Sequence, residues 1–289
     1  MEISWIGLVL VSALLHPLRD LMLKGTEHPT LCYAGISFTW VIQAGFHAVA
    51  TGQSLALPQE IAPFIAVSVM GLTLYYYGTL SALRRGNLST YYPIIRSSPI
   101  AIVVFSWLVM DHNYSWFTIV GIFTVLLGSL MIQKTPGRFL QDQKAFALAI
   151  LAMLGSAAYS ISDAGAMQLT TPAVFLFYTN ISATILLLGI QRWESRLDAM
   201  SFADALRQWM KAPWRIILAG VSSYLSYLFI LMAFQLGAEA AAVSAVRQAS
   251  IPVSIILAAI ILLEPKFFKN IAWASLIALG ILFITLSSP

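Results

Sequence analysis

The sequence predicts an all-α membrane protein with ten transmembrane helices. This prediction rests on the composition, on ten long apolar windows and on the charge of the connections between them. Of the 289 residues, 59% are hydrophobic and 10% are charged, and the mean hydropathy is +0.83. A soluble domain usually carries about 25% charged residues. Most of this apolar surface is therefore expected to face lipid or other membrane helices.

Ten windows are long and apolar enough to cross a hydrocarbon core about 30 Å thick. Most connections between them are short, so consecutive helices are expected to run antiparallel. The longest connection, 191–213, contains SFADALRQWM, which has the pattern of a short amphipathic helix at the membrane interface. The predicted spans are residues 3–23, 30–50, 60–82, 88–110, 115–133, 144–166, 172–190, 214–236, 240–263 and 270–286.

The basic residues are distributed very unevenly between the two sides of these spans. Of the 16 lysines and arginines, 13 fall in the odd-numbered connections, and none falls in an even-numbered connection or at either terminus. The other three, Arg19, Arg96 and Arg247, lie within spans. By the positive-inside rule, the odd connections are cytoplasmic and both termini face outward. We expect a multi-pass protein of a bacterial inner membrane with periplasmic termini.

The two halves of the chain contain similar junctions. ALRRGNLSTYYPIIRSSPI leads into the fourth span, and AFQLGAEAAAVSAVRQASIP leads into the ninth. When their first glycines are aligned, Arg96 matches Arg247. The sequence therefore predicts two five-helix repeats, 1–138 and 139–289. An odd number of helices inverts the second repeat, and such repeats hold a binding site near the membrane midplane.

These residues resemble a known family. The ten spans, and the two junctions that run from glycine through proline to Asp111 and to Glu264, are similar to the drug/metabolite transporter superfamily and to its EamA branch. The resemblance implies a secondary transporter whose central cavity is lined mainly by helices 1, 3, 4, 6, 8 and 9. Members carry amino acids, nucleotide sugars, sugar phosphates, drugs and other metabolites. The arginine three residues before the proline of helix 4 departs from the usual pattern.

Arg96 and Arg247 are the first candidates for a binding site. Both fall near the middle of a predicted span, where a charge costs about 3 kcal/mol or more. Such a charge normally faces a cavity or a partner. One interpretation is a structural pair with an acid or a backbone carbonyl. The other is anion binding, because guanidinium groups bind carboxylate and phosphate through two parallel hydrogen bonds.

The remaining candidates are polar or aromatic residues within the spans. Asp163 can neutralise an arginine, carry a coupling proton or hold a substrate ammonium. His16 and Arg19 lie one helical turn apart and share a face, although packing and snorkelling are the alternatives for them. Glu239 is expected to cap the ninth span. The predicted substrate-binding residues are Arg96, Arg247, Tyr76, Tyr227, Tyr159, Asp163, Arg19 and His16.

The sequence also argues against several classes of protein. It contains no phosphate-binding loop or dinucleotide motif, one cysteine, and no pattern typical of a metal site. The basic residues lie in short connections and form no arginine-rich run. We therefore expect no enzyme activity, no cofactor, no metal and no nucleic-acid partner.

The predicted function is secondary active or exchange transport of a small organic anion or zwitterion, such as an amino acid or a phosphorylated or phosphonate metabolite. One alternative is an exporter of amphiphilic or cationic compounds with structural arginines. Another, outside transport, is an intramembrane lipid-handling protein or enzyme. The expected partners are a small-molecule substrate and the lipid bilayer, with protons as a candidate coupling ion. Both a monomer and a homodimer are compatible with the sequence.

Overall fold

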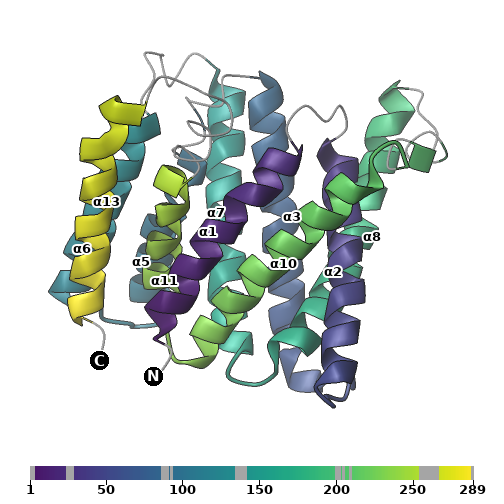
Figure 1. Ribbon diagram of the computed structural model, residues 1–289, viewed down its shortest axis with the longest axis horizontal. Helices are drawn as coiled ribbons and strands as arrows, with labels where there is room; N and C mark the ends of the chain where they lie inside the picture. The colour runs from purple at the N-terminus through teal and green to yellow at the C-terminus, as the bar shows by residue number, and fades with distance from the viewer. Residues whose placement is uncertain are drawn as a thin grey trace.

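The computed structural model describes residues 4–23, 29–85, 91, 94–133, 142–198, 203, 206–207, 210–253 and 267–287, and these residues contain helices but no strand. The helices stand side by side, and the first turn of α1 and the last turn of α13 lie at the same end of the molecule (Figure 1). The described helices are α1 (Trp5–Leu23), α2 (Pro29–Ala50), η1 (Gln59–Ile61), α3 (Ala62–Arg85), α5 (Ser98–Val109), α6 (Trp116–Gln133), α7 (Gln143–Ala166), α8 (Pro172–Asp198), α10 (Pro213–Gln235), α11 (Ala240–Val246), η2 (Arg247–Ala249) and α13 (Phe267–Ser287).

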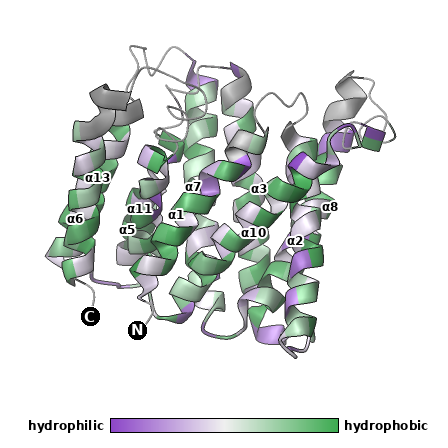
Figure 2. Ribbon diagram, in the orientation of Figure 1, coloured by the Kyte–Doolittle hydropathy of each residue, from purple (hydrophilic) through white to green (hydrophobic). Residues whose placement is uncertain are grey.

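Each of the ten α-helices overlaps one predicted span, which confirms the predicted all-α fold. Within the described residues, four helical segments are long and apolar enough to cross a membrane: Gln59–Ala82, Gln143–Ala166, Pro172–Trp193 and Pro213–Gln235. Four shorter apolar helices accompany them. Figure 2 shows hydrophobic residues along most of the helix lengths and many of the hydrophilic residues near the helix ends. Large apolar side chains such as Phe46 and Trp116 are exposed, as expected for lipid-facing positions.

Four close helix pairs build the molecule: α3 with α7, α1 with α10, α2 with α8, and α6 with α13. Glycines allow two of these pairs to approach backbone to backbone, as is common between membrane helices. A Cβ atom at Gly155 of α7 would lie 2.6 Å from the carbonyl oxygen of Gly71 in α3. A Cβ atom at Gly280 of α13 would lie 2.7 Å from the carbonyl oxygen of Gly121 in α6.

Two predicted spans are not continuous helices. In the fourth span a turn at Arg96 and Ser97 precedes α5, and in the ninth span α11 gives way to the 3-10 segment η2 at Arg247. The predicted spans 88–110 and 240–263 are therefore interrupted at these points, which the apolar windows alone did not indicate. The physical cause is a proline three residues after Arg96 and five residues after Arg247. Proline has no N–H to donate to the carbonyl four residues earlier, and its ring clashes with that carbonyl.

The two helix breaks pack against each other, because α5 contacts α11. The hydroxyl oxygens of Ser98 and Ser244 lie 3.2 Å apart across this contact. The side-chain amide of Gln248 donates a hydrogen bond of 2.9 Å to the backbone carbonyl of Arg96. This bond gives a partner to a carbonyl at the turn, which has left the regular helical pattern. The contact brings Arg96 and Arg247 to neighbouring positions in the fold.

One acid in the even-numbered connections differs from expectation. Glu239 occupies the position before α11, but its side chain makes no capping hydrogen bond to the helix. Its carboxylate instead lies 3.2 Å from Nε2 of His112, in the connection between α5 and α6. The predicted cap is thus replaced by a side-chain hydrogen bond between His112 and Glu239 that joins the two halves of the chain. Glu264 and most of the predicted interface helix at 201–210 lie outside the described residues.

The contact between α3 and α7 predicts unequal effects of the same substitution at two glycines. Gly155→Ala places a methyl group against the Gly71 backbone, and we expect it to lower the free energy of unfolding by about 1–3 kcal/mol. Gly189→Ala is the matched control, because nothing lies within 4 Å of its Cβ position in α8. It is expected to be neutral or stabilising by up to about 1 kcal/mol. Thermal unfolding in detergent measures both variants, and equal melting temperatures would contradict the prediction.

Candidate functional site

A cavity of about 80 Å³ lies among the helices at the level of the two breaks. Its walls come from α1, α3, the fourth-span break, α7, α10 and the ninth-span break, which are the helices that the family resemblance implies. Residues of α2 and α8 complete the walls. All eight predicted substrate-binding residues line it: His16, Arg19, Tyr76, Arg96, Tyr159, Asp163, Tyr227 and Arg247.

Helix α1 supplies an arginine and a histidine to the cavity. His16 and Arg19 are three residues apart on one helical face, which brings their side chains together. The Arg19 guanidinium lies 3.4 Å from Nε2 of His16 and 5.7 Å from the centre of the Tyr33 ring. A guanidinium only donates hydrogen bonds, so Nε2 of His16 is the acceptor in this contact. Both side chains are buried, at 9% and 8% exposure.

The helix breaks supply the other two arginines. Arg96 is partly buried in the turn before α5, and its backbone carbonyl is held by Gln248. The guanidinium of Arg247 lies 5.7 Å from the centre of the Tyr227 ring, a distance at which a cation is attracted to an aromatic face. Among the described residues, Arg247 forms no ion pair. Its position is therefore fixed by the helix break and by an aromatic ring rather than by an acid.

Asp163 is the acid of the cavity and is almost fully buried, at 1% exposure. It lies on α7, one turn after Tyr159. The hydroxyl of Tyr227 donates a hydrogen bond to its Oδ2. Its other oxygen, Oδ1, makes no hydrogen bond of normal geometry in the described part of the chain, although the Ser68 hydroxyl lies close to the carboxyl group. Buried polar atoms usually have a partner, so this oxygen is an exception that invites a ligand donor.

Aromatic rings surround this acid. The ring of Tyr227 lies 5.6 Å from Trp40 and 6.4 Å from Tyr159, measured between ring centres. Tyr75 lies 5.9 Å from Tyr159 in an edge-to-face arrangement. The indole N–H of Trp40 donates a 3.0 Å hydrogen bond to the hydroxyl of Ser223, which fixes the ring. The wall beside Asp163 therefore offers aromatic faces in defined orientations.

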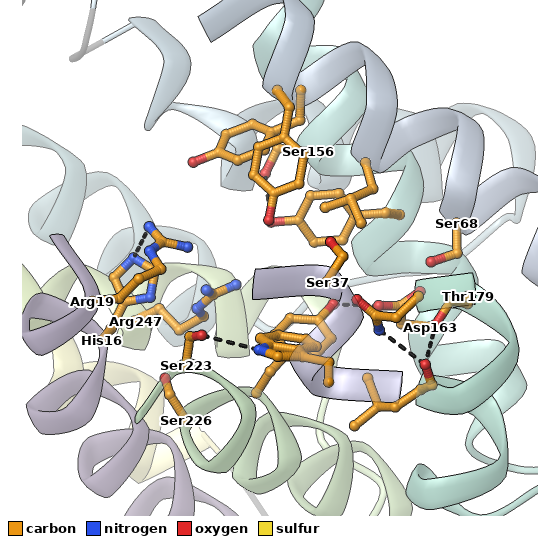
Figure 3. A pocket seen from close by; sticks show the side chains of 18 of the residues that line it. His16, Arg19, Ser37, Ser68, Ser156, Asp163, Thr179, Ser223, Ser226 and Arg247 are labelled. Carbon is orange, nitrogen blue, oxygen red and sulfur yellow. Dashed lines mark hydrogen bonds between the residues drawn. The ribbon is translucent and has the colours of Figure 1, made fainter. Parts of the chain in front are cut away.

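The charges of the cavity are separated in space. Figure 3 shows His16, Arg19 and Arg247 on one side, and Asp163 with Ser68 and Thr179 on the other. The described lining contains three arginines and a single acid, so positive charge is in excess. In such a buried site, with few competing waters, a charged ligand is attracted more strongly than at the surface.

The sequence reasoning missed several lining residues. Asn180 and Gln248 carried a usable signal, because amide side chains within apolar windows are costly in a membrane and normally face a cavity or a partner. The lining serines and threonines carried none, since such hydroxyls commonly bond to their own helix. Thr179 does so, donating to the Phe175 carbonyl at 2.8 Å.

A second cavity of about 740 Å³ lies between α3, α5 and α7, and its lining is mainly apolar. Phe64, Val67, Phe105, Leu154 and Ile161 are among its lining residues, and none of the eight predicted site residues is. The described residues contain no group of three His, Cys, Asp or Glu side chains that is arranged to hold a metal ion.

Comparisons with known proteins show a family resemblance in the first part of the chain. Residues 3–133 match the EamA-like transporter family. No curated protein matches the chain. One crystal structure of a protein with 16% sequence identity covers 99% of this chain and 100% of its own, with a TM-score of 0.76, a likeness that shows the fold. The first part of the chain, residues 3–133, is therefore similar to the EamA-like transporter family of the drug/metabolite transporter superfamily, and the whole chain shares the fold of this solved structure.

Proposed function

We propose that the protein is a secondary active or exchange transporter that moves a small organic anion or zwitterion across the membrane by alternating access. Members of the EamA-like family are transporters rather than enzymes, so the chain is a multi-pass membrane transporter of a small molecule. The class of substrate and the roles of the arginines are the new part of the proposal. In it, Arg96 and Arg247 bind the anionic group.

The observation that carries this proposal is the gathering of three arginines around one cavity with a single described acid. A structural role for Arg247 would require an anionic partner, because an uncompensated charge in the membrane costs about 3 kcal/mol or more. Arg247 forms no ion pair among the described residues, and Asp163 is bound by the Tyr227 hydroxyl instead. An anionic substrate would supply the missing charge, and guanidinium groups suit carboxylate and phosphate geometry.

A two-fold relation between residues 1–138 and 139–289 would explain how the site opens. Exchanging equivalent helices of the two halves turns the α3–α7 pair into the α10–α1 pair, and it returns the α2–α8 and α6–α13 pairs to themselves. These observed pairs support inverted repeats. Rocking of one half against the other would then expose the site to each side in turn. The cavity of about 80 Å³ is small beside ligand sites of roughly 300–1,000 Å³, so a closed conformation fits this scheme.

The apolar cavity favours one alternative, the export of amphiphilic compounds. With a volume of about 740 Å³ and a mainly apolar lining, it has the size and chemistry of a site for a hydrophobic molecule. In that case the arginines would be structural, and the transported molecule would be bound between α3, α5 and α7. Binding of hydrophobic cations without binding of anions would distinguish this function from the one proposed.

The proposed function predicts that variants of the two arginines lose affinity for the substrate. We expect an anionic or zwitterionic member of a panel of amino acids, dicarboxylates, phosphorylated metabolites and phosphonates to raise the melting temperature of the purified wild type. In Arg96→Ala and Arg247→Ala the affinity is expected to fall about 10-fold or more, since a hydrogen bond to a charged group contributes about 1.5–3 kcal/mol.

Arg192→Ala is the control for this experiment, because Arg192 is an exposed residue of α8 away from the cavity. It should bind like the wild type. Quaternary ammonium compounds belong in the same panel. Stabilisation by these cations alone, or unchanged anion binding in both cavity variants, would disprove the proposed roles of the arginines.

We also propose that the odd-numbered connections face the cytoplasm, as their basic residues suggest. In a Cys32→Ser background, Ser54→Cys lies in the connection after α2, and Met210→Cys lies in the connection before α10. We expect a membrane-impermeant thiol reagent to label Ser54→Cys in intact cells. It should label Met210→Cys only after the membrane is permeabilised. The opposite pattern would show that the orientation is reversed.

A further inference from the structure

We infer that the cavity is a bipolar site for a zwitterion, with the substrate's ammonium group at Asp163 and its anionic group at the arginine side. This inference rests on the proposed transport function and narrows its substrate class. It assigns Asp163 a direct role in binding substrate rather than in pairing with an arginine. The argument depends on the unmatched oxygen of Asp163, the aromatic rings beside it, and the separation of the opposite charges.

The first step is the incomplete hydrogen bonding of Asp163. The carboxyl group is almost fully buried, and Oδ1 has no partner among the described residues, whereas Oδ2 accepts the Tyr227 hydroxyl. A buried acceptor without a donor is destabilising. An ammonium group carries three N–H donors and a positive charge, so it would satisfy Oδ1 and neutralise the carboxylate together.

The second step is the chemistry of the wall next to Asp163. The centre of the Tyr227 ring lies 5.6 Å from that of Trp40 and 6.4 Å from that of Tyr159, and all three residues line the cavity. Aromatic faces attract cations through their negative quadrupole and are a recurrent feature of ammonium sites. A carboxylate beside aromatic rings favours an ammonium and repels an anion.

The third step is that the opposite charges of the cavity do not pair with each other. Asp163 and Arg247 form no ion pair. Tyr227 contacts both: its hydroxyl donates to Asp163, and its ring lies 5.7 Å from the Arg247 guanidinium. The same tyrosine therefore contacts both the acid and the base, which form no direct ion pair. Figure 3 shows this separation, with Arg247, Arg19 and His16 across the cavity from Asp163.

The cavity thus presents the Asp163 carboxylate on one side and guanidinium groups on the other (Figure 3). A molecule that carries both an ammonium group and an anionic group is complementary to this arrangement. An organic anion without an amine would occupy the arginine side and leave Oδ1 of Asp163 without a donor. A compact zwitterion would satisfy both ends at once. The competing role for Asp163 is to carry a coupling proton, and the experiment below separates this role from ammonium binding.

The experiment compares zwitterions with partners that lack only the amine. Isothermal titration calorimetry on the purified full chain would measure 2-aminoethylphosphonate against ethylphosphonate, and leucine against 4-methylpentanoate. We expect the wild type to bind at least one of the zwitterions at least 10-fold more tightly than its deaminated partner. In Asp163→Asn this preference should fall below about 3-fold, through weaker binding of the zwitterion alone, because the neutral amide no longer attracts the ammonium.

Asp111→Asn is the matched control, since Asp111 is an exposed residue at the end of α5 and its φ of 50° is one that asparagine also adopts. It should keep the wild-type preference. Equal binding of the paired compounds by the wild type would overturn the inference while leaving anion transport intact. This comparison needs no variant, so it remains decisive if Asp163→Asn does not fold.

The remaining outcomes are also informative. A zwitterion preference that survives in Asp163→Asn would overturn the inference and would leave proton coupling as the role of Asp163. If the wild type binds the amine-free anions but no zwitterion, the inference fails and the proposed function stands. If it binds neither anions nor zwitterions, both fail together.

Discussion

Burying guanidinium groups between membrane helices is the constraint on which the rest of this structure depends. Each such charge costs about 3 kcal/mol or more in the hydrocarbon region unless it faces a polar cavity or a partner. The protein meets this cost by gathering Arg19, Arg96 and Arg247 around one enclosed space together with polar side chains of the surrounding helices.

Two features of the backbone make this arrangement possible. The helix breaks before Pro99 and Pro252 place Arg96 and Arg247 where the backbone has left its regular pattern, and Gln248 gives the Arg96 carbonyl a partner. Elsewhere, glycines let helices approach so closely that a single methyl group would collide with the neighbouring backbone. Irregular backbone at membrane depth is tolerated where protein or a cavity surrounds it. The glycine contacts therefore allow close packing of the helices, and the helix breaks position the two arginines.

Tyr227 connects the chemistry of the two ends of the cavity. Its hydroxyl binds Asp163 on α7 and its ring faces Arg247 on η2, so one side chain from α10 contacts two opposite charges that form no ion pair with each other. A direct pair would neutralise both groups and remove the driving force for binding a charged substrate. Under the proposed function, these separated charges favour the binding of a charged substrate, and they are separated again when the substrate leaves.

The sequence by itself determined the ten apolar spans and the uneven distribution of basic residues, because both depend on residue type along the chain. It also singled out eight residues that the structure places around one cavity, since charged and aromatic side chains within apolar windows stand out without coordinates. Only the tertiary structure decided the positions of the helix breaks, the Glu239–His112 pair in place of a helix cap, and the contact of Trp40 with Tyr227. These features join residues far apart in the chain, and their geometry depends on how helices pack, which hydrophobicity and local spacing do not encode.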